Sequence, residues 1–138
     1  MTDKMAIVLF SGTVDKLLPV GIMASGAVAM GMDVDIFATF WGLNAMRKDM
    51  LTSNMKMSKD FEEMAGPMMQ LMQQKGVQPW FETLKKAKEL GNVRIHACAM
   101  TFDLMGLKKE HMADFVDDVV AVGEFIDMAR DAKMTLFI

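Results

Sequence analysis

The sequence contains very little cysteine and histidine. Cys98 is the only cysteine among 138 residues, and His96 and His111 are the only histidines. One cysteine excludes an intramolecular disulfide and every CxxC metal or redox motif. One cysteine with one nearby histidine is also too small a ligand set for zinc, so we expect no bound metal. The lack of paired cysteines agrees with a reducing compartment, and we expect a cytoplasmic location.

Long hydrophobic runs are also missing. The longest uncharged stretch, Leu17 to Met32, has 16 residues and contains one proline and three glycines. A membrane span needs roughly 20 apolar residues, so we expect no transmembrane segment. Asp3 and Lys4 lead directly into an apolar run. A signal peptide would instead have a basic region before a longer apolar core, so we expect a soluble chain without one.

Excess positive charge and nucleotide motifs are absent as well. The formal net charge of -3 gives no electrostatic attraction for nucleic acid, so no nucleic-acid partner is expected. The turn Ser11-Gly12-Thr13 lacks both the GxGxxG and the GxxxxGK[ST] spacing, and we expect no cofactor. A hydrophobic fraction of 52% with 24% charged residues is typical of one ordered domain over residues 1–138, and the apolar excess predicts a homo-oligomer.

Short apolar runs alternate with segments that favour helices. Thr13 or Asp15 is suited to cap the first helix, and Gly31 to end it. The strand-like runs lie at 5–10, 33–38, 93–98, 116–120 and 135–138, and the helix-like segments at about 14–30, 80–90 and 123–132. This alternation predicts an α/β fold, with a parallel sheet and helices on both faces.

A methionine-rich segment interrupts the pattern. Met46 to Met72 holds eight of the 18 methionines without sustained periodicity, and Pro67 prevents one uninterrupted helix. We therefore expect a mobile insertion at about 46–76, hereafter the Met-rich segment. Three interpretations remain open for it: a lid or interface helix, an adaptable contact for a protein or membrane partner, or a soft-metal site. A Cu(I) site would use Met55-x-Met57 and Met68-Met69-x-x-Met72.

Cys98 closes the strand-like run that begins at Val93, and residues 99–106 read as a loop opening into a short helix. Ligands and reactive groups collect where parallel strands end and helices begin. Backbone N–H groups and the helix dipole there favour a thiolate, which makes Cys98 a candidate nucleophile. The alternative is a buried, unreactive cysteine that only fills space.

The neighbours of Cys98 leave alternatives open. His96 shares its face of the strand at roughly 7 Å, too far for a direct proton relay. A cationic ring would still favour the thiolate, whereas a structural histidine would be satisfied by a helix cap. Asp103 either stabilises a helix start or opposes thiolate formation.

Other residues near the predicted strand ends are also ambiguous. Phe40-Trp41-Gly42 follows a strand, so Trp41 either lines a pocket or anchors a helix from the core. The carboxylate pairs Glu62-Glu63 and Asp117-Asp118 are interpreted as solvated surface.

Several segments together resemble the DsrE/DsrF-like sulfur-relay family, with the DsrE2/DsrE3-type branch most similar. The most specific blocks are Phe-Trp-Gly-Leu at 40–43 and Ala-Cys-x-Met-x-x-Asp-Leu-Met-Gly at 97–106. Residues 6–16, 27–32 and 135–138 extend the resemblance over the whole chain.

The resemblance implies a three-layer α/β/α fold with a five-stranded, mainly parallel sheet, assembled as a homo-oligomer. It also implies that Cys98 carries sulfur as a persulfide or thiosulfonate. Some relatives have a second cysteine, which this chain lacks, so it has no internal disulfide step. Partners implied are sulfur donor and acceptor proteins of the TusA-like, rhodanese-like or disulfide-reductase kinds.

The leading hypothesis is therefore a sulfur carrier, with possible sulfurtransferase activity, that uses Cys98 and exchange at sulfur. We expect the substrate pocket to be formed by Ser11, Gly12, Thr13, Trp41, Met100 and Thr101. The alternative is a non-catalytic Met-rich module that binds a soft metal or a membrane-associated partner.

Overall fold

Five short strands form one sheet in which every neighbouring pair is parallel. The computed structural model describes residues 2–138. The strands are β1 (Lys4–Leu9), β2 (Asp33–Ala38), β3 (Val93–Cys98), β4 (Asp118–Val120) and β5 (Met134–Phe137). Their order across the sheet is β4-β3-β2-β1-β5. Parallel neighbours need crossover connections, and these bring helices onto both faces.

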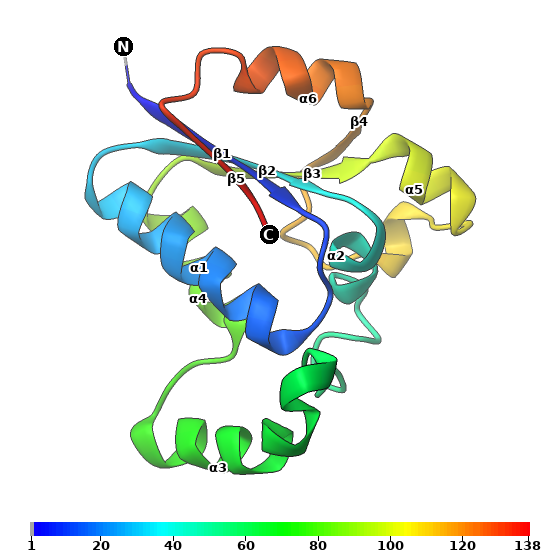
Figure 1. Cartoon of the computed structure of the whole chain (residues 1–138). Coiled ribbons are helices and arrows are strands. Elements are labelled where there is room, and N and C mark those ends of the chain that lie inside the picture. Colours follow the sequence, from blue (N-terminus) through cyan, green and yellow to red (C-terminus); the bar gives the residue numbers. More distant parts are fainter. Residues whose placement is uncertain (1) are drawn as a thin grey trace.

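The helices complete three layers (Figure 1). α1 (Val14–Ala29) and α4 (Trp80–Leu90) pack together on one face of the sheet, and α6 (Val122–Ala129) covers the other. α2 (Phe40–Ala45) and α5 (Ala99–Leu104) follow β2 and β3 at their carboxyl ends, and the Met-rich segment contributes η1 (Lys59–Met64) and α3 (Ala65–Lys75). A short turn, η2 (Lys109–His111), precedes β4. The predicted three-layer α/β fold is confirmed, and none of the described helices is long and apolar enough to span a membrane.

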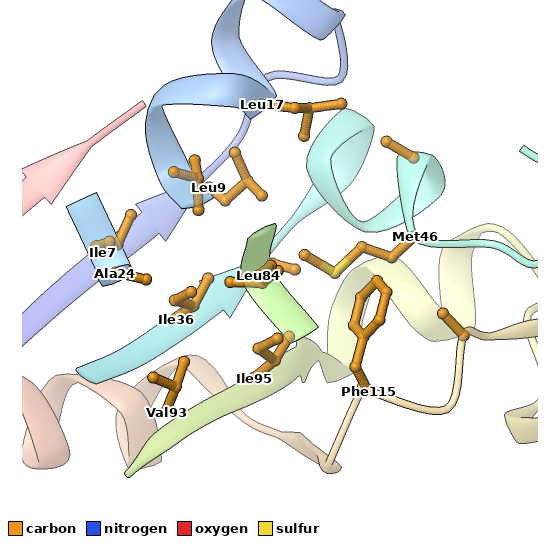
Figure 2. Close-up of a cluster of buried hydrophobic side chains, with 14 of the residues drawn as sticks. Ile7, Leu9, Leu17, Ala24, Ile36, Met46, Leu84, Val93, Ile95 and Phe115 are labelled. Carbon is orange, nitrogen blue, oxygen red and sulfur yellow. The ribbon is translucent and has the colours of Figure 1, made fainter. Parts of the chain in front are cut away.

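The main core lies between the sheet and the α1/α4 layer (Figure 2). Ile7, Ile36 and Ile95 lie on three adjacent strands on the face that carries Leu84 of α4, and Ile7 lies beside Ala24 of α1. All of these side chains are fully buried. Alternation along a strand sends the intervening residues to the opposite face.

That opposite face carries a smaller core beneath α6. Its buried members are Ala6, Phe37, Cys98, Val120 and Phe125. Phe125 of α6 stacks on Phe37 of β2 with 4.8 Å between ring centroids. The predicted face of Cys98, opposite to Ile95 and Ala97, is confirmed, and the thiol therefore belongs to the thinly covered side of the sheet.

Some predicted boundaries were wrong. Residues after Cys98 form no loop, because α5 begins at Ala99. β4 begins at Asp118 rather than 116, since Asp117 uses its amide and carboxylate to hold Ile95 of β3. Thr13 is the N-cap of α1 but makes no side-chain cap, and the Val14 N–H donates to the Lys56 carbonyl at 2.7 Å. The helix start is thus tied to the Met-rich segment.

The Met-rich segment is uneven in its packing. Met46 is fully buried and belongs to the main core, whereas η1 and α3 contain no buried residue. Pro67 lies in the first turn of α3, where a proline is tolerated. In Figure 1, α3 lies farthest from the sheet, beyond α1 and α4.

The last residue completes the turn after β1. The Ile138 carbonyl accepts hydrogen bonds from the Phe10 N–H at 2.7 Å and the Ser11 N–H at 3.2 Å. The turn that leads to Gly12 and Thr13 is therefore held by the strand that lies last in the sequence.

Candidate functional site

Cys98 lies at the junction of β3 and α5. It is the last residue of the strand and the N-cap of the helix, and only 7% of its surface is exposed. Burial alone raises the pKa of its thiol. Hydrogen bonds from the Thr101 hydroxyl and N–H, the Thr39 hydroxyl and the Met100 N–H more than offset that effect, and the pKa lies below the usual value. The site therefore favours a thiolate that is nearly covered by protein.

Two threonines supply the hydroxyl donors. Thr101 is fully buried, and its Oγ1 lies 3.2 Å from Oγ1 of Thr39. The Phe40 N–H donates to Thr101 Oγ1 at 3.1 Å. The Thr101 oxygen therefore accepts a backbone hydrogen bond, and its single hydroxyl hydrogen goes either to Thr39 Oγ1 or to the sulfur.

Phe40 adopts an unusual backbone conformation in this arrangement. Its φ of 47° lies in the left-handed region, where a residue with a bulky side chain is rarely found. Such a conformation costs about 1–3 kcal/mol and persists only where its surroundings enforce it. Here it accompanies the hydrogen bond that orients Thr101.

His96 forms a buried charge network on the same face of the sheet. Its Nδ1 lies 2.6 Å from Asp118 Oδ1, and its Nε2 lies 2.8 Å from Asp35 Oδ1. Lys4 and Arg94 continue the network as partners of Asp35 and Asp118, at 2.9 and 3.5 Å. When both carboxylates are ionised, both ring nitrogens that face them donate, and the ring is then an imidazolium.

The pKa directions agree with this charge state. Burial lowers the pKa of His96, but the hydrogen bonds and charges of Asp35 and Asp118 outweigh burial and leave it above the usual value. Burial raises the pKa of Asp35, and the hydrogen bonds from His96 and Lys4 bring it below the usual value. The expected helix-cap partner of His96 was wrong, because neighbouring strands provide its partners instead.

The interpretation of Asp117 and Asp118 as solvated surface was incomplete, because both are partly exposed but also make specific contacts. Asp117 Oδ2 accepts hydrogen bonds from Lys88 Nζ at 2.5 Å and from the Ile95 N–H at 2.7 Å. These carboxylates anchor the short edge strand β4 to β3. Asp103, in contrast, is exposed, and its side chain forms no hydrogen bond or salt bridge within residues 2–138, so neither role expected for it is filled.

The residues expected to form one pocket are divided between two places. Ser11, Gly12, Thr13 and Trp41 line a pocket of about 560 Å³. Trp41 is 54% exposed, so it lines a pocket and is not a core anchor. A Cβ on Gly12 would lie 2.5 Å from the Trp41 carbonyl oxygen, which explains why glycine is needed at this approach.

Met100 and Thr101 lie with Cys98, not with that pocket. Thr101 is buried against Thr39. The Met100 side chain is 73% exposed, and only the backbone N–H of Met100 donates a hydrogen bond to the thiol. Trp41 lines the pocket, whereas the preceding Phe40 donates its N–H to Thr101 beside the thiol, so the start of α2 contributes to both places.

Sequence reasoning missed Thr39, Asp35 and the partners of His96. Thr39 had a usable signal, because it follows β2 as Cys98 ends β3, and Ala38 pairs with Ala97 in the sheet. The carboxyl ends of parallel strands meet at one edge, so their next residues are neighbours. Asp35 lies within an apolar run and gave no comparable signal.

Comparisons with known proteins identify similar chains over the full length. The profile of the DsrE/DsrF/DrsH-like family matches residues 1–137. YrkE of Bacillus subtilis strain 168, named only as uncharacterized, is 34% identical over 158 aligned residues, which cover 99% of this chain and 98% of that protein. The sulfur carrier protein DsrE2 of Allochromatium vinosum is 30% identical over 158 residues, 98% of each chain.

Two solved structures are similar in fold. The protein of unknown function MTH1491 from Methanobacterium thermoautotrophicum has a TM-score of 0.61 and 16% identity, covering 99% of both chains. The ychN protein from E. coli has a TM-score of 0.60 and 13% identity, covering 100% of both chains. At these identities the likeness extends to the fold alone.

Proposed function

Because the chain belongs to the DsrE/DsrF/DrsH-like family, as its motifs predicted, we propose that it is a sulfur carrier that works through Cys98. The observation that carries the proposal is the buried thiol at the end of β3, whose pKa is lowered by hydrogen bonds. A relative over nearly its full length is named a sulfur carrier protein, which supports the same role here.

The proposed loading step is exchange at sulfur. The Cys98 thiolate attacks the outer sulfur of a donor persulfide, R–S–SH, and a new S–S bond forms. The S–S bond of the donor breaks, and R–S⁻ leaves with the bonding electron pair. Cys98 then holds the transferred sulfur as Cys98–S–SH, and no external oxidant or reductant is needed.

Unloading is the same reaction in reverse order. An acceptor thiolate attacks the outer sulfur of Cys98–S–SH, and Cys98 leaves as a thiolate with the electron pair. A leaving thiolate of lowered pKa departs faster. The groups that stabilise it are the Thr39 and Thr101 hydroxyls and the Met100 N–H. Since Cys98 is the only cysteine, the acceptor thiol must belong to another molecule.

We also propose that the chain forms a homo-oligomer. Hydrophobic side chains on α5 and α6 are well exposed, with Leu104 67% exposed and Val122 and Ile126 each 58% exposed. We assign these residues to the interface of a homo-oligomer. Separate donor and acceptor proteins of the TusA-like, rhodanese-like or disulfide-reductase kinds, in the cytoplasm, remain the partners we expect.

The Met-rich binding module remains the second candidate for one reason. Met55, Met69 and Met72 line a cavity of about 300 Å³ beside Trp80 and Phe81, and no charged side chain lines it. Thioethers in such a place are suited to a soft metal or to an apolar partner side chain. This function needs no reactive thiol, which separates it from sulfur transfer.

Intact-mass measurement tests the proposal. The wild-type chain and Cys98→Ser are incubated with polysulfide or tetrathionate, and a sulfur adduct is expected on the wild type alone. A dithiol added afterwards should remove it. Equal labelling of both chains, or no adduct with either donor, would contradict the carrier function and favour the binding module.

A further inference from the structure

The pocket beside Trp41 has a charge that contrasts with the rest of the chain. Three lysines, Lys16, Lys56 and Lys59, line it, and its lining contains no aspartate or glutamate. The chain as a whole has a net charge of -3. Within residues 2–138, none of these lysines forms a salt bridge. Three like charges at one pocket repel one another unless an anion joins them.

The lysines come from two elements that are fastened together. Lys16 lies in the first turns of α1, whereas Lys56 and Lys59 lie in the Met-rich segment. The Lys56 carbonyl accepts the Val14 N–H at 2.7 Å, and Asn54 Nδ2 donates to the Gly12 carbonyl at 2.9 Å. This part of the segment is therefore held against α1, although η1 and α3 beyond it contain no buried residue.

The acidic groups nearest in sequence do not line the pocket, although Asp15 is bonded to Ser58, which does. Asp15 accepts hydrogen bonds from the Ser58 N–H at 3.0 Å and from the Ser58 hydroxyl at 2.5 Å. It thereby fixes the segment between Lys56 and Lys59 without lining the pocket. Asp60 is exposed and does not line it either.

Aromatic and hydroxyl groups complete the wall. Trp41 and Phe10 are 54% and 37% exposed, and Ser11, Thr13 and Asn44 add polar atoms. We propose that this pocket is a binding site for a small oxyanion with two or more negative charges, held by Lys16, Lys56 and Lys59 in the pocket that Trp41 helps to line. Charge-assisted hydrogen bonds from ammonium groups are the strong polar contacts available for such an anion.

The site is separate from the thiol. Cys98 does not line the pocket. Anion binding therefore needs no covalent step and does not depend on the proposed sulfur transfer. The shared chemistry includes sulfur oxyanions, such as thiosulfate and tetrathionate, and phosphorus oxyanions, such as pyrophosphate.

Titration of the Cys98→Ser chain tests the inference without any thiol chemistry. Thiosulfate, tetrathionate and pyrophosphate are titrated separately, with calorimetry for affinity and tryptophan fluorescence as the local signal. At least one anion should bind, and added salt should weaken it. Fluorescence should change through Trp41, because the other tryptophan, Trp80, is only 3% exposed. In Trp41→Phe the fluorescence change should disappear.

Two matched triple variants test whether Lys16, Lys56 and Lys59 bind the anion. Lys16→Gln, Lys56→Gln and Lys59→Gln together should weaken binding by about tenfold or more. Lys75→Gln, Lys108→Gln and Lys133→Gln, which change the net charge equally at exposed sites outside the pocket, should leave binding nearly unchanged. Equal weakening by both triples, or no binding of any of the three anions at low salt, would overturn the inference. The anion with the highest affinity shows whether the site prefers a sulfur oxyanion or a phosphorus oxyanion.

Discussion

At the residue scale, hydrogen bonds control the reactivity of Cys98. The thiol is 7% exposed, so burial works against the thiolate, and the threonine and backbone donors reverse that effect. The position of Cys98 could be predicted from the strand-like run before it. The donors could not, because Thr39 is 59 positions away in the sequence and becomes a neighbour only through the pairing of β2 with β3.

Removing one hydroxyl tests this control. Thr101→Val keeps the side-chain shape and should raise the pKa of Cys98, because the thiolate loses a donor. The alkylation rate of Cys98 by iodoacetamide at neutral pH should fall by about tenfold. The rate is followed against pH by mass spectrometry.

A control variant separates this effect from loss of structure. Thr135→Val changes an exposed threonine on β5 and should leave the rate unchanged. Thr39→Val should act in the same direction as Thr101→Val. If Thr101→Val and Thr39→Val both react as fast as the wild type at every pH, the threonine hydrogen bonds do not lower the pKa of Cys98.

His96 makes stability depend on pH in a definite direction. Its pKa is above the usual value in the folded chain, so its contribution is complete below the unfolded pKa and is lost as pH rises through the folded pKa. Asp35 acts oppositely, since its lowered pKa gives stability that is lost as pH falls through the folded value. Stability contributed by the pair is therefore greatest at pH values between these two transitions.

Urea unfolding over a pH series checks this expectation. His96→Gln should lower the free energy of unfolding by about 2–3 kcal/mol at mildly acidic pH, because two carboxylates lose a cationic partner. The difference from the wild type should shrink as pH rises. Parallel stability curves for the two chains would exclude an imidazolium at this position.

At the element scale, the best-predicted parts are those with an unbroken local signal. β2, α4 and β3 were predicted at their observed boundaries, because apolar runs or a proline and a glycine mark their ends. β4 was less predictable, since its paired aspartates resemble a solvated turn and are used only by residues from other elements. The pocket was partly predictable, but Lys56 and Lys59 lie in a segment without periodicity.

The close approach of the Gly12 turn to α2 gives a stability prediction. Gly12→Ala should destabilise the fold by about 1–3 kcal/mol, since its Cβ would meet the Trp41 carbonyl oxygen. Gly66→Ala in α3 is the matched control, because a Cβ there has no neighbour within 4 Å and alanine favours a helix. Thermal unfolding is measured for Gly12→Ala and Gly66→Ala. Equal melting temperatures of these two variants would contradict the steric role of Gly12.

Hydrogen exchange tests the mobility expected of the Met-rich segment. Amides of α3 should exchange far faster than those of β1, because α3 has no buried residue and β1 is paired on both sides. Equal protection of the two would make α3 part of the rigid structure. Slowing of α3 exchange by stoichiometric Cu(I) in Cys98→Ser would favour a soft-metal site.

At the scale of the whole molecule, the thinly covered face of the sheet is the natural place for a second copy. α6 is the helix over this face, and Val122 and Ile126 point their side chains to solvent. A helix that packs inward through Phe125 while exposing such residues is expected to be covered by protein.

Light scattering tests this assembly. The wild type should have a mass that is a multiple of 15.4 kDa at micromolar concentration, and Val122→Asp with Ile126→Asp should lower it. Glu124→Gln, on the exposed surface of the same helix, is the control. A wild-type mass of 15.4 kDa would contradict the homo-oligomer.

The position of β5 beside β1 has a consequence for synthesis on the ribosome. β1 is translated long before its partner β5 and the Ile138 carbonyl that holds the Phe10–Ser11 turn. Until β5 is made, the nascent chain exposes one unpaired edge of β1, which invites pairing with other chains. Folding therefore competes with aggregation while the residues between β1 and β5 are translated, and slower translation of this stretch should lower the yield.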